Sequence, residues 1–170
     1  MKVLVTGATG FLGGWLVKRL LAEGLEVRII KRANSSLEEL EGLKLDLVDG
    51  DVTDKESLIR AARGVDTVFH LAGVIGYSRS QRAAMERVNV EGTRNVIDAC
   101  EANGVRKLVH LSSVVAIGAG FDKTPLTETS PYNVAHLKLG YFDTKHDAEL
   151  LIQEAVRAGR VDAVMINPST

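Results

Sequence analysis

The 170-residue sequence predicts an α/β fold, a doubly wound parallel sheet of the Rossmann type with helices on both faces. Short apolar runs, rich in valine, leucine and isoleucine, alternate along the chain with segments of helical periodicity. A glycine-rich turn joins the first apolar run to the first helical segment. The connections between the apolar runs are long enough to be the helical crossovers that parallel strands require.

The N-terminal segment contains two predicted strands with a helix between them. Residues 3–5 are apolar and mostly β-branched, as expected of a buried strand. Residues 12–21 repeat apolar side chains at helical spacing, and Gly24 ends that helix. Residues 27–30 form the second strand. The order strand, helix, strand predicts the first parallel pair of the sheet.

Two predicted capping boxes and two further strands follow. Ser or Thr with Glu three residues later occurs at 36–39 and at 53–56, which predicts a short helix after the first and a helix to Ala62 after the second. Strands are predicted at 43–48 and at 65–71, the latter buried from its fourth residue onward.

The C-terminal half repeats the alternation. We expect a long helix over 80–102, a strand at 107–112, a helix over 137–158 and a strand at 161–166. Residues 118–136 are rich in Gly, Pro, Thr, Ser and Asn, so they predict a loop with room for one short helical turn.

Composition excludes several classes of function. The chain is 45% hydrophobic and 25% charged, with a net charge of −1, as expected of one soluble globular domain without an electrostatic footprint for nucleic acid. No apolar run is long enough for a signal peptide or a membrane span, so we expect a cytoplasmic protein. The single cysteine, Cys100, is expected to be a core thiol, and no metal site is predicted.

The turn after the first strand predicts a dinucleotide site. Gly7, Gly10 and Gly13 are spaced G-x-x-G-x-x-G between a strand and a helix. One glycine permits the tight turn, another lets a pyrophosphate approach the backbone, and the third lets the helix pack close to the strand. The helix N-terminus then offers unpaired N–H groups to phosphate. The alternative is a glycine-rich turn that binds nothing.

The end of the second strand bears on the choice of cofactor. NAD sites usually place Asp or Glu there to hold the ribose hydroxyls. Here the strand ends in Lys31 and Arg32, and no acidic residue follows directly. A guanidinium fork suits a 2′-phosphate, so the pair favours NADP(H), with NAD(H) as the alternative. Alternatively, both residues are solvated charges at a strand end.

Candidate catalytic residues lie on a predicted helix and at the end of a predicted strand. Tyr141 and Lys145 lie one helical turn apart, and an ammonium group at that distance would lower the pKa of the phenol and make it a general acid or base. Ser112 and Ser113 come at the end of the fifth strand, at the edge where open parallel sheets bind ligands, and a serine hydroxyl there can hold a substrate oxygen. Read alone, the tyrosine and lysine could be an ordinary surface pair. His70 lies within the fourth strand, and we interpret it as structural.

Asn89 and Gly92 are poor choices for the middle of a helix. That misfit could mark a function, a break in the helix, or neither.

Seven short motifs span the chain in a fixed order: T-G-A-T-G-F-L-G (6–13), G-D-V-T-D (50–54), H-L-A-G (70–73), N-V-E-G-T-R-N-V (89–96), L-S-S (111–113), Y-F-D-T-K (141–145) and N-P-S (167–169). Together they resemble the N-terminal part of an extended short-chain dehydrogenase/reductase, a group also described as the NAD-dependent epimerase/dehydratase family. The resemblance implies a catalytic set of Ser113, Tyr141 and Lys145, with Asn89 as a fourth, helix-borne active-site residue.

The same resemblance implies a set of cofactor-binding residues. Asp51 and Val52 would lie near the adenine, and Lys145 would touch the nicotinamide ribose as well as tune the tyrosine. The full set is Gly7, Thr9, Gly10, Phe11, Leu12, Gly13, Lys31, Arg32, Asp51, Val52, Leu71, Ala72, Gly73, Tyr141, Lys145 and Pro168.

Within that family, the basic pair at 31–32 looks most like the NADPH-dependent, dihydroflavonol-reductase-like members. We therefore expect an NADP(H)-dependent oxidoreductase that moves hydride between nicotinamide and a ketone, aldehyde or alcohol substrate. One alternative is an NAD-dependent nucleotide-sugar epimerase or dehydratase. Another is a non-catalytic dinucleotide-binding protein, against which the Ser113, Tyr141 and Lys145 set argues.

The resemblance also bears on domains and partners. We expect residues 1–170 to be the NAD(P)-binding domain, and the smaller C-terminal region that chooses the substrate in longer relatives to be absent from this chain. The expected partner is a small-molecule substrate, with no nucleic acid and no membrane. A homodimer that packs its long helices as a four-helix bundle is implied by the resemblance alone.

Overall fold

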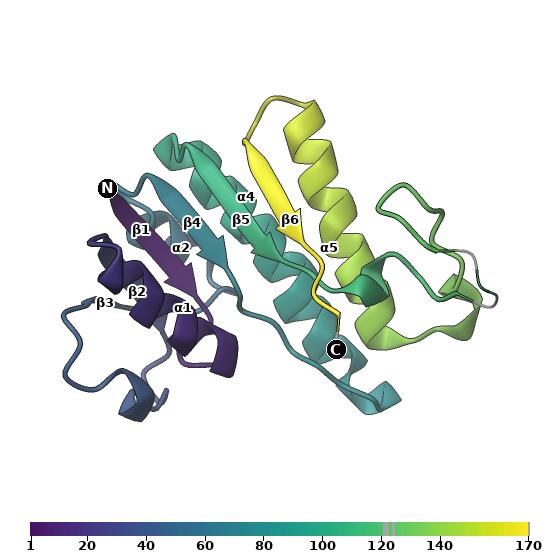
Figure 1. Ribbon diagram of the computed structural model, residues 1–170, viewed down its shortest axis with the longest axis horizontal. Helices are drawn as coiled ribbons and strands as arrows, with labels where there is room; N and C mark the ends of the chain where they lie inside the picture. Colours follow the sequence, from purple (N-terminus) through teal and green to yellow (C-terminus); the bar gives the residue numbers. More distant parts are fainter. Residues whose placement is uncertain (121–122, 124, 170) are drawn as a thin grey trace.

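The computed structural model describes residues 1–120, 123 and 125–169. Its core is one parallel sheet of six strands in the order β3-β2-β1-β4-β5-β6 (Figure 1). The strands are β1 (Lys2–Thr6), β2 (Glu26–Lys31), β3 (Asp46–Asp49), β4 (Thr67–His70), β5 (Lys107–Leu111) and β6 (Ala163–Ile166). The order reverses between β1 and β4, which makes this the switch point of a doubly wound sheet and confirms the predicted fold class.

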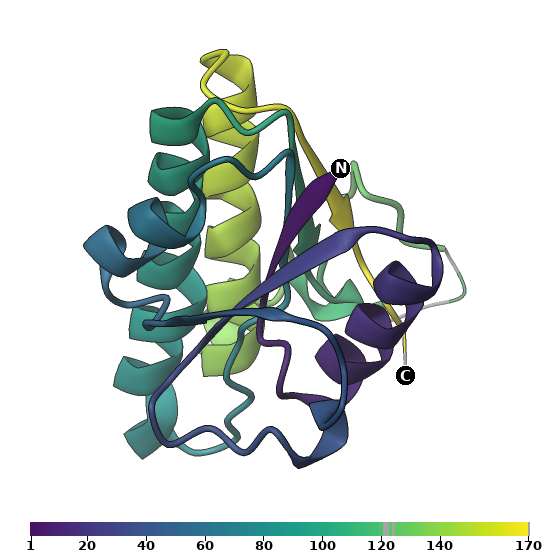
Figure 2. The same ribbon diagram turned by 90° about the vertical axis from the view of Figure 1, so that its left-hand side faces the viewer.

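Helices lie on both faces of the sheet, but unequally. They are α1 (Phe11–Ala22), α2 (Lys55–Ala61), α3 (Arg82–Met85), α4 (Gly92–Asn103) and α5 (Gly140–Arg157). Figure 2 shows α2, α4 and α5 in a layer on one face and α1 on the other. Among the described residues, no helix combines the length and the apolar character that crossing a membrane requires.

The sheet separates two hydrophobic cores. Val3 and Val5 of β1 pack on the side of α1, whereas Leu4 between them packs on the side of α2, α4 and α5. This alternation is the ordinary period of a strand that is covered on both faces. Cys100 belongs to the larger core, as expected, and burial raises the pKa of its thiol to about 12.

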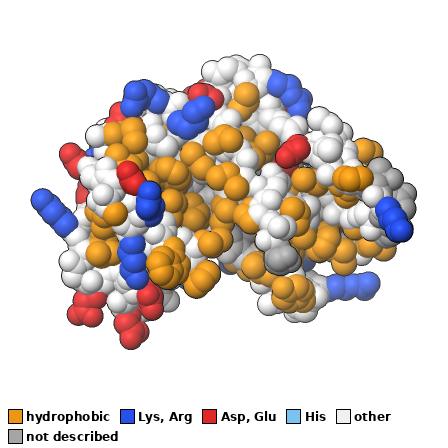
Figure 3. All heavy atoms as spheres, viewed as in Figure 1, with side chains coloured by type: hydrophobic (Ala, Val, Ile, Leu, Met, Phe, Trp, Pro, Cys, Tyr) orange, Lys and Arg blue, Asp and Glu red, His pale blue; other side chains and the backbone are white. Residues whose placement is uncertain are grey.

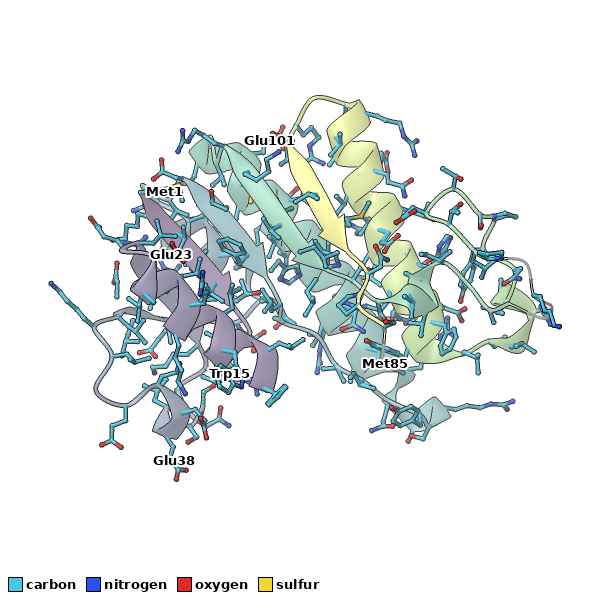
Figure 4. The ribbon with its side chains drawn as sticks, viewed as in Figure 1. Met1, Trp15, Glu23, Glu38, Met85 and Glu101 are labelled. Atoms are coloured by element: carbon cyan, nitrogen blue, oxygen red, sulfur yellow. The ribbon has the colours of Figure 1, made fainter. Side chains whose placement is uncertain are left out.

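Part of the α1 face carries no helix in the described part of the chain. Val164 and Ile166 of β6 are 46% and 50% exposed, whereas Met165 between them packs into the opposite core. Figure 3 shows hydrophobic side chains gathered on this face of the molecule. Trp15 of α1, labelled in Figure 4, is also 65% exposed. The expected burial of the fourth strand is wrong in detail, because Phe69 lies on this open face and is only partly buried.

Neither predicted capping box forms. Asp54, not Thr53, caps α2, because its carboxylate accepts the N–H groups of Glu56 and Ser57 at 3.1 and 3.3 Å. The Thr53 hydroxyl instead donates to Asp51. Residues 36–39 lead only to a 3₁₀ turn over Glu38–Leu40 without a side-chain cap. The predicted strand at 43–48 also starts later, because its leucines pack beneath α1 before β3 begins.

The predicted helix over 80–102 is irregular. A π-helical turn over Glu86–Glu91 separates α3 from α4, so the misfit at Asn89 marks a break in regular helical geometry. The predicted loop 118–136 contains a 3₁₀ turn that runs from Ala135 to Leu137, and its residues 121, 122 and 124 lie outside the described residues. Lys138 then adopts a left-handed φ of 53°, so α5 begins at Gly140 rather than at 137.

Candidate active site

The glycine turn lies between β1 and α1 and touches the segment that follows β4. Gly7 has a φ of 70°, and a Cβ atom there would lie 2.6 Å from the backbone nitrogen of Ala72. A Cβ atom at Gly13 would overlap the carbonyl oxygen of Gly7. Both positions therefore exclude any side chain, and the turn packs backbone to backbone as the sequence predicts.

The N-terminus of α1 opens from this turn. Gly10 is the N-cap residue and supplies no side chain to the first backbone N–H groups of the helix. Those N–H groups have no intrahelical acceptor, and the helix dipole adds partial positive charge at the same place. Phe11 is 83% exposed there, so nothing in the described part of the chain covers the start of the helix. The geometry suits a phosphate group.

A cavity of about 310 Å³ runs along the carboxyl ends of β1, β2 and β4. Ten residues of the predicted cofactor set line it: Gly7, Thr9, Gly10, Lys31, Arg32, Asp51, Val52, Leu71, Ala72 and Gly73. Six do not: Phe11, Leu12, Gly13, Tyr141, Lys145 and Pro168. Ile30, Ser35, Gly50, Val74 and Val88 also line the cavity and were not predicted. Gly50 stands directly before Asp51 in the G-D-V-T-D motif, which is the signal that could have found it.

The two basic residues at the end of β2 differ in their surroundings. The Lys31 ammonium group donates to the carboxylate of Asp49, its partner in the β2–β3 register. Arg32 makes no ion pair within the described part of the chain. Of the two charges, the one on Arg32 is therefore the less neutralised at this end of the cavity.

Helix α5 brings Lys145 to the end of β5. Its Nζ atom donates to the carbonyl oxygen of Leu111 at 2.7 Å. Burial lowers the pKa of Lys145 to about 8, and the negative charge of Glu149 opposes that shift. A Cβ atom at Gly73 would lie 4.0 Å from Nζ, so the ammonium group lies behind the part of the cavity wall that Gly73 forms, without lining the cavity itself.

Tyr141 is half-buried one helical turn before Lys145. Burial raises the pKa of its phenol, and a hydrogen bond from Ser113 acts in the opposite direction. The expectation that Lys145 lowers this pKa is wrong here, because desolvation raises the pKa of the phenol and the Lys145 nitrogen is directed at the Leu111 carbonyl. The phenol is therefore protonated at neutral pH and is available as a proton donor.

Two backbone contacts fix the loop that carries Ser113. Asn167 donates from its side-chain nitrogen to the Ser113 carbonyl oxygen at 3.0 Å and to the Glu149 carboxylate at 2.6 Å. The carbonyl oxygen of Pro168 accepts the N–H of Val114 at 3.2 Å. Pro168, expected to bind cofactor, thus holds the serine loop in this structure and does not line the cavity.

Asn89 is 2% exposed, and its side chain is fully engaged. Its oxygen accepts the N–H of Val74 at 2.8 Å, and its nitrogen donates to the Val74 carbonyl at 3.0 Å and to the Thr144 hydroxyl at 3.1 Å. Asn89 therefore ties the segment after β4 to the helix of Tyr141. The structure brings Asn89 beside the predicted catalytic set, as a clamp between the Val74 backbone and the Thr144 side chain.

A second cavity, of about 300 Å³, has Tyr141 in its lining and shares no lining residue with the first. The segments 76–79 and 137–142 line it, with Arg82 between them. This space is where a molecule could reach the tyrosine hydroxyl from outside the dinucleotide cavity.

A glycine turn at the switch point of an open parallel sheet, with a cavity along its strand ends, defines a dinucleotide-binding domain. The chain belongs to the NAD dependent epimerase/dehydratase family, whose sequence description matches residues 3–170. The predicted family resemblance is thereby confirmed.

Several known proteins are similar to this chain. A Synechocystis protein named "Putative dihydroflavonol 4-reductase" is 37% identical over 98% of this chain and 48% of its own length. Cinnamoyl-CoA reductase 1 of Petunia hybrida is 38% identical over 98% of this chain and 53% of its own length. The structure of Thermus thermophilus UDP-glucose 4-epimerase in complex with NAD matches with a TM-score of 0.85 and 31% identity, over 98% of this chain and 54% of that one. The chain thus spans about half the length of the relatives it matches.

Proposed function

We propose that this chain binds NADP(H) and contributes Ser113, Tyr141 and Lys145 to hydride transfer between the nicotinamide and a ketone, aldehyde or alcohol substrate. One observation carries the proposal. Gly73 lines the cavity, and a Cβ atom there would lie 4.0 Å from Nζ of Lys145, so the ammonium group lies directly behind this part of the cavity wall. The proposed cofactor site therefore adjoins Lys145, which lies one helical turn after Tyr141, the candidate proton donor.

The residues present fit the cofactor. The backbone cradle at Gly7 and the open start of α1 suit the pyrophosphate. Arg32 suits a 2′-phosphate, and Asp51 and Val52 line the part of the cavity where an adenine would lie. When bound, NADP(H) supplies or accepts the hydride.

Side chains of this domain transfer the proton. In the reductive direction the neutral Tyr141 phenol donates its proton to the carbonyl oxygen of the substrate, and in the oxidative direction it takes that proton back. The Ser113 hydroxyl orients the same oxygen. Lys145, fixed by the Leu111 carbonyl, holds positive charge next to the developing phenolate at neutral pH, where an amine with a pKa of about 8 is mainly protonated.

A second candidate is an NAD-dependent epimerase or dehydratase for nucleotide sugars. Asp49 favours it, because its carboxylate neutralises Lys31 at the strand end where an NADP site needs positive charge. Relatives of this kind include the Thermus thermophilus epimerase. A non-catalytic dinucleotide-binding role is disfavoured, since such a protein needs no proton donor beside its cofactor.

The relatives are about twice as long as this chain. We propose that residues beyond this domain choose the substrate, and that α4 and α5 form the interface of a homodimer. Both proposals rest on the family resemblance.

The test is hydride transfer in a single turnover, with NADPH and a panel of small ketones and aldehydes. Tyr141→Phe removes one hydroxyl, so the chemical step should slow by about 10²–10⁴-fold. Tyr132→Phe is the matched control, because that hydroxyl donates to Asp143 and lies outside the cavities beside Tyr141 and the glycine turn. A rate for Tyr141→Phe within about threefold of the parent would eliminate Tyr141 as the proton donor.

A further inference from the structure

A chain of buried polar side chains runs between the sheet and α4. Thr6, His70 and Thr93 are all 0% exposed. The Thr6 hydroxyl lies 2.7 Å from Nδ1 of His70, and the Thr93 hydroxyl lies 3.1 Å from Nε2 of the same ring. Since both ring nitrogens have partners, the state of the imidazole is decided by what each hydroxyl does with its single hydrogen.

The Thr93 hydroxyl determines one side. Its oxygen lies 2.6 Å from the backbone carbonyl oxygen of Asn89, one turn earlier. A carbonyl oxygen only accepts, so the Thr93 hydrogen must point to Asn89. Toward His70 the Thr93 oxygen can then only accept, and Nε2 must carry the imidazole hydrogen.

The Thr6 hydroxyl determines the other side. Its oxygen accepts the backbone N–H of Ala72 at 3.2 Å. With the hydrogen on Nε2, the neutral ring presents a lone pair at Nδ1, and the Thr6 hydroxyl donates to it. A positively charged ring would turn a second N–H toward Thr6. Burial opposes that charge and lowers the pKa of His70 to about 3, with the charge of Lys145 acting in the same direction.

The hydrogen bonds therefore run in one direction. The Ala72 N–H donates to Thr6, Thr6 donates to His70, His70 donates to Thr93, and Thr93 donates to the Asn89 carbonyl. Each hydrogen and each acceptor in this buried path is used once. Such a path tolerates no reversal of a single member, because a reversed hydroxyl would leave a buried group unpaired.

The two ends of the path hold functional backbone. Thr6 directly precedes Gly7, which packs against Ala72. At the other end, the Asn89 side chain clamps Val74 and donates to the Thr144 hydroxyl. That hydroxyl donates to the carbonyl oxygen of Gly140 at 2.8 Å, one residue before Tyr141.

We propose that His70, held as the neutral Nε2–H tautomer, is a positioning residue that couples the glycine turn to the helix of Tyr141 and Lys145. The coupling to dinucleotide rests on the proposed function, whereas the tautomer and its coupling to the turn do not. The competing possibility is a buried ring that only fills space, for which either tautomer would serve.

The first test is direct observation of the ring by nitrogen-15 NMR. His70→Asn identifies its signals among the four histidines of the chain. We expect the hydrogen on Nε2, a lone pair on Nδ1, and no change between pH 5 and pH 8. His110 provides the contrast, because neither of its buried ring nitrogens has a partner in the described residues. A hydrogen on Nδ1 of His70, or protonation in that range, would overturn the proposal.

The second test breaks the path away from the cavity. Thr93→Val keeps the side-chain shape but removes the hydroxyl, and Thr93→Ser restores it. In Thr93→Val we expect shifted amide signals at Gly7, Thr9 and Gly10 and an NADPH Kd raised by about 5-fold or more, the lower range of coupling between sites. Thr93→Ser should lie close to the parent in both readouts.

Unchanged turn amides in a folded Thr93→Val chain would contradict the coupling. If NADPH fails to bind the parent chain, the proposed function fails. The tautomer of His70 and the amide shifts in Thr93→Val still decide whether the hydrogen-bonded path couples to the glycine turn. If Thr93→Val does not fold, the tautomer in the parent remains decisive, because a hydrogen on Nδ1 of His70 would break the path on which the coupling depends.

Discussion

Gly7 and Gly24 have nearly the same backbone conformation in very different surroundings. Their φ angles are 70° and 76°, in the left-handed region that side chains rarely adopt. A Cβ atom at Gly7 would lie 2.6 Å from the Ala72 nitrogen, whereas one at Gly24 would meet nothing within 4 Å. Replacing each by alanine therefore separates the cost of the conformation from the cost of the overlap.

The magnitudes follow from that difference. Gly24→Ala should lower the free energy of unfolding by about 1–2 kcal/mol, the cost of a left-handed conformation for an L-residue. Gly7→Ala carries the same cost plus about 1–3 kcal/mol for forcing a methyl group against backbone that cannot move aside. The total for Gly7→Ala is about 2–5 kcal/mol.

Urea denaturation measures the stabilities, and fluorescence titration measures NADPH affinity. Gly7→Ala should weaken NADPH binding by about tenfold or more, equivalent to about 1.4 kcal/mol, because the displaced turn is the proposed pyrophosphate cradle. Gly24→Ala should leave affinity unchanged, because it lies at the far end of α1. Equal stability losses, or equal affinities, in the two variants would refute the role assigned to close packing at Gly7.

Three further predictions concern the active site and the length of the chain. The pKa of Lys145 is about 8 in the folded chain and 10.5 in the unfolded chain, so the unfolded chain binds more protons between those pH values. As the pH rises from 8 to 10.5, the free energy of unfolding of the parent should therefore increase relative to that of Lys145→Met. Parallel pH profiles from urea denaturation of the two proteins would contradict the burial of the ammonium group. Asn167→Ala should leave NADPH affinity intact but slow single-turnover hydride transfer, because the Ser113 loop and the Glu149 carboxylate lose a donor while the residues that line the cavity keep their contacts; a loss of affinity alone would contradict this. This chain should bind dinucleotide yet turn over slowly, because none of the described residues closes the site against water; turnover equal to that of a full-length reductase would contradict the proposed need for a further region.

The order of strands and helices was predictable because each parallel strand here has an apolar run and each crossover has helical periodicity. The glycine turn was predictable because Gly7 and Gly13 satisfy local backbone demands that only glycine meets. The π-helical turn was visible only as a misfit at Asn89. Its cause is tertiary, since Asn89 reaches across to Val74 and Thr144.

Other features depend on neighbours that sequence order does not reveal. The pair of Lys31 with Asp49 follows from the register of β2 on β3, so the apparent absence of an acid at the strand end was misleading. Thr53 and Asp54 are adjacent capping residues, and only the geometry of the turn selects Asp54. The raised pKa of Tyr141 reflects burial, which one helical turn of sequence does not determine.

The most direct test of the dinucleotide claim is a parallel fluorescence titration of the parent chain with NADPH and NADH. We expect NADPH to bind more tightly by about 10-fold or more, since charge-assisted hydrogen bonds contribute roughly 1.5–3 kcal/mol. Arg32→Ala should abolish that difference. Lys31→Ala should leave most of it, because Asp49 already neutralises Lys31. Equal affinities of the parent for both cofactors would contradict the NADP(H) assignment, and binding of neither would contradict the site itself.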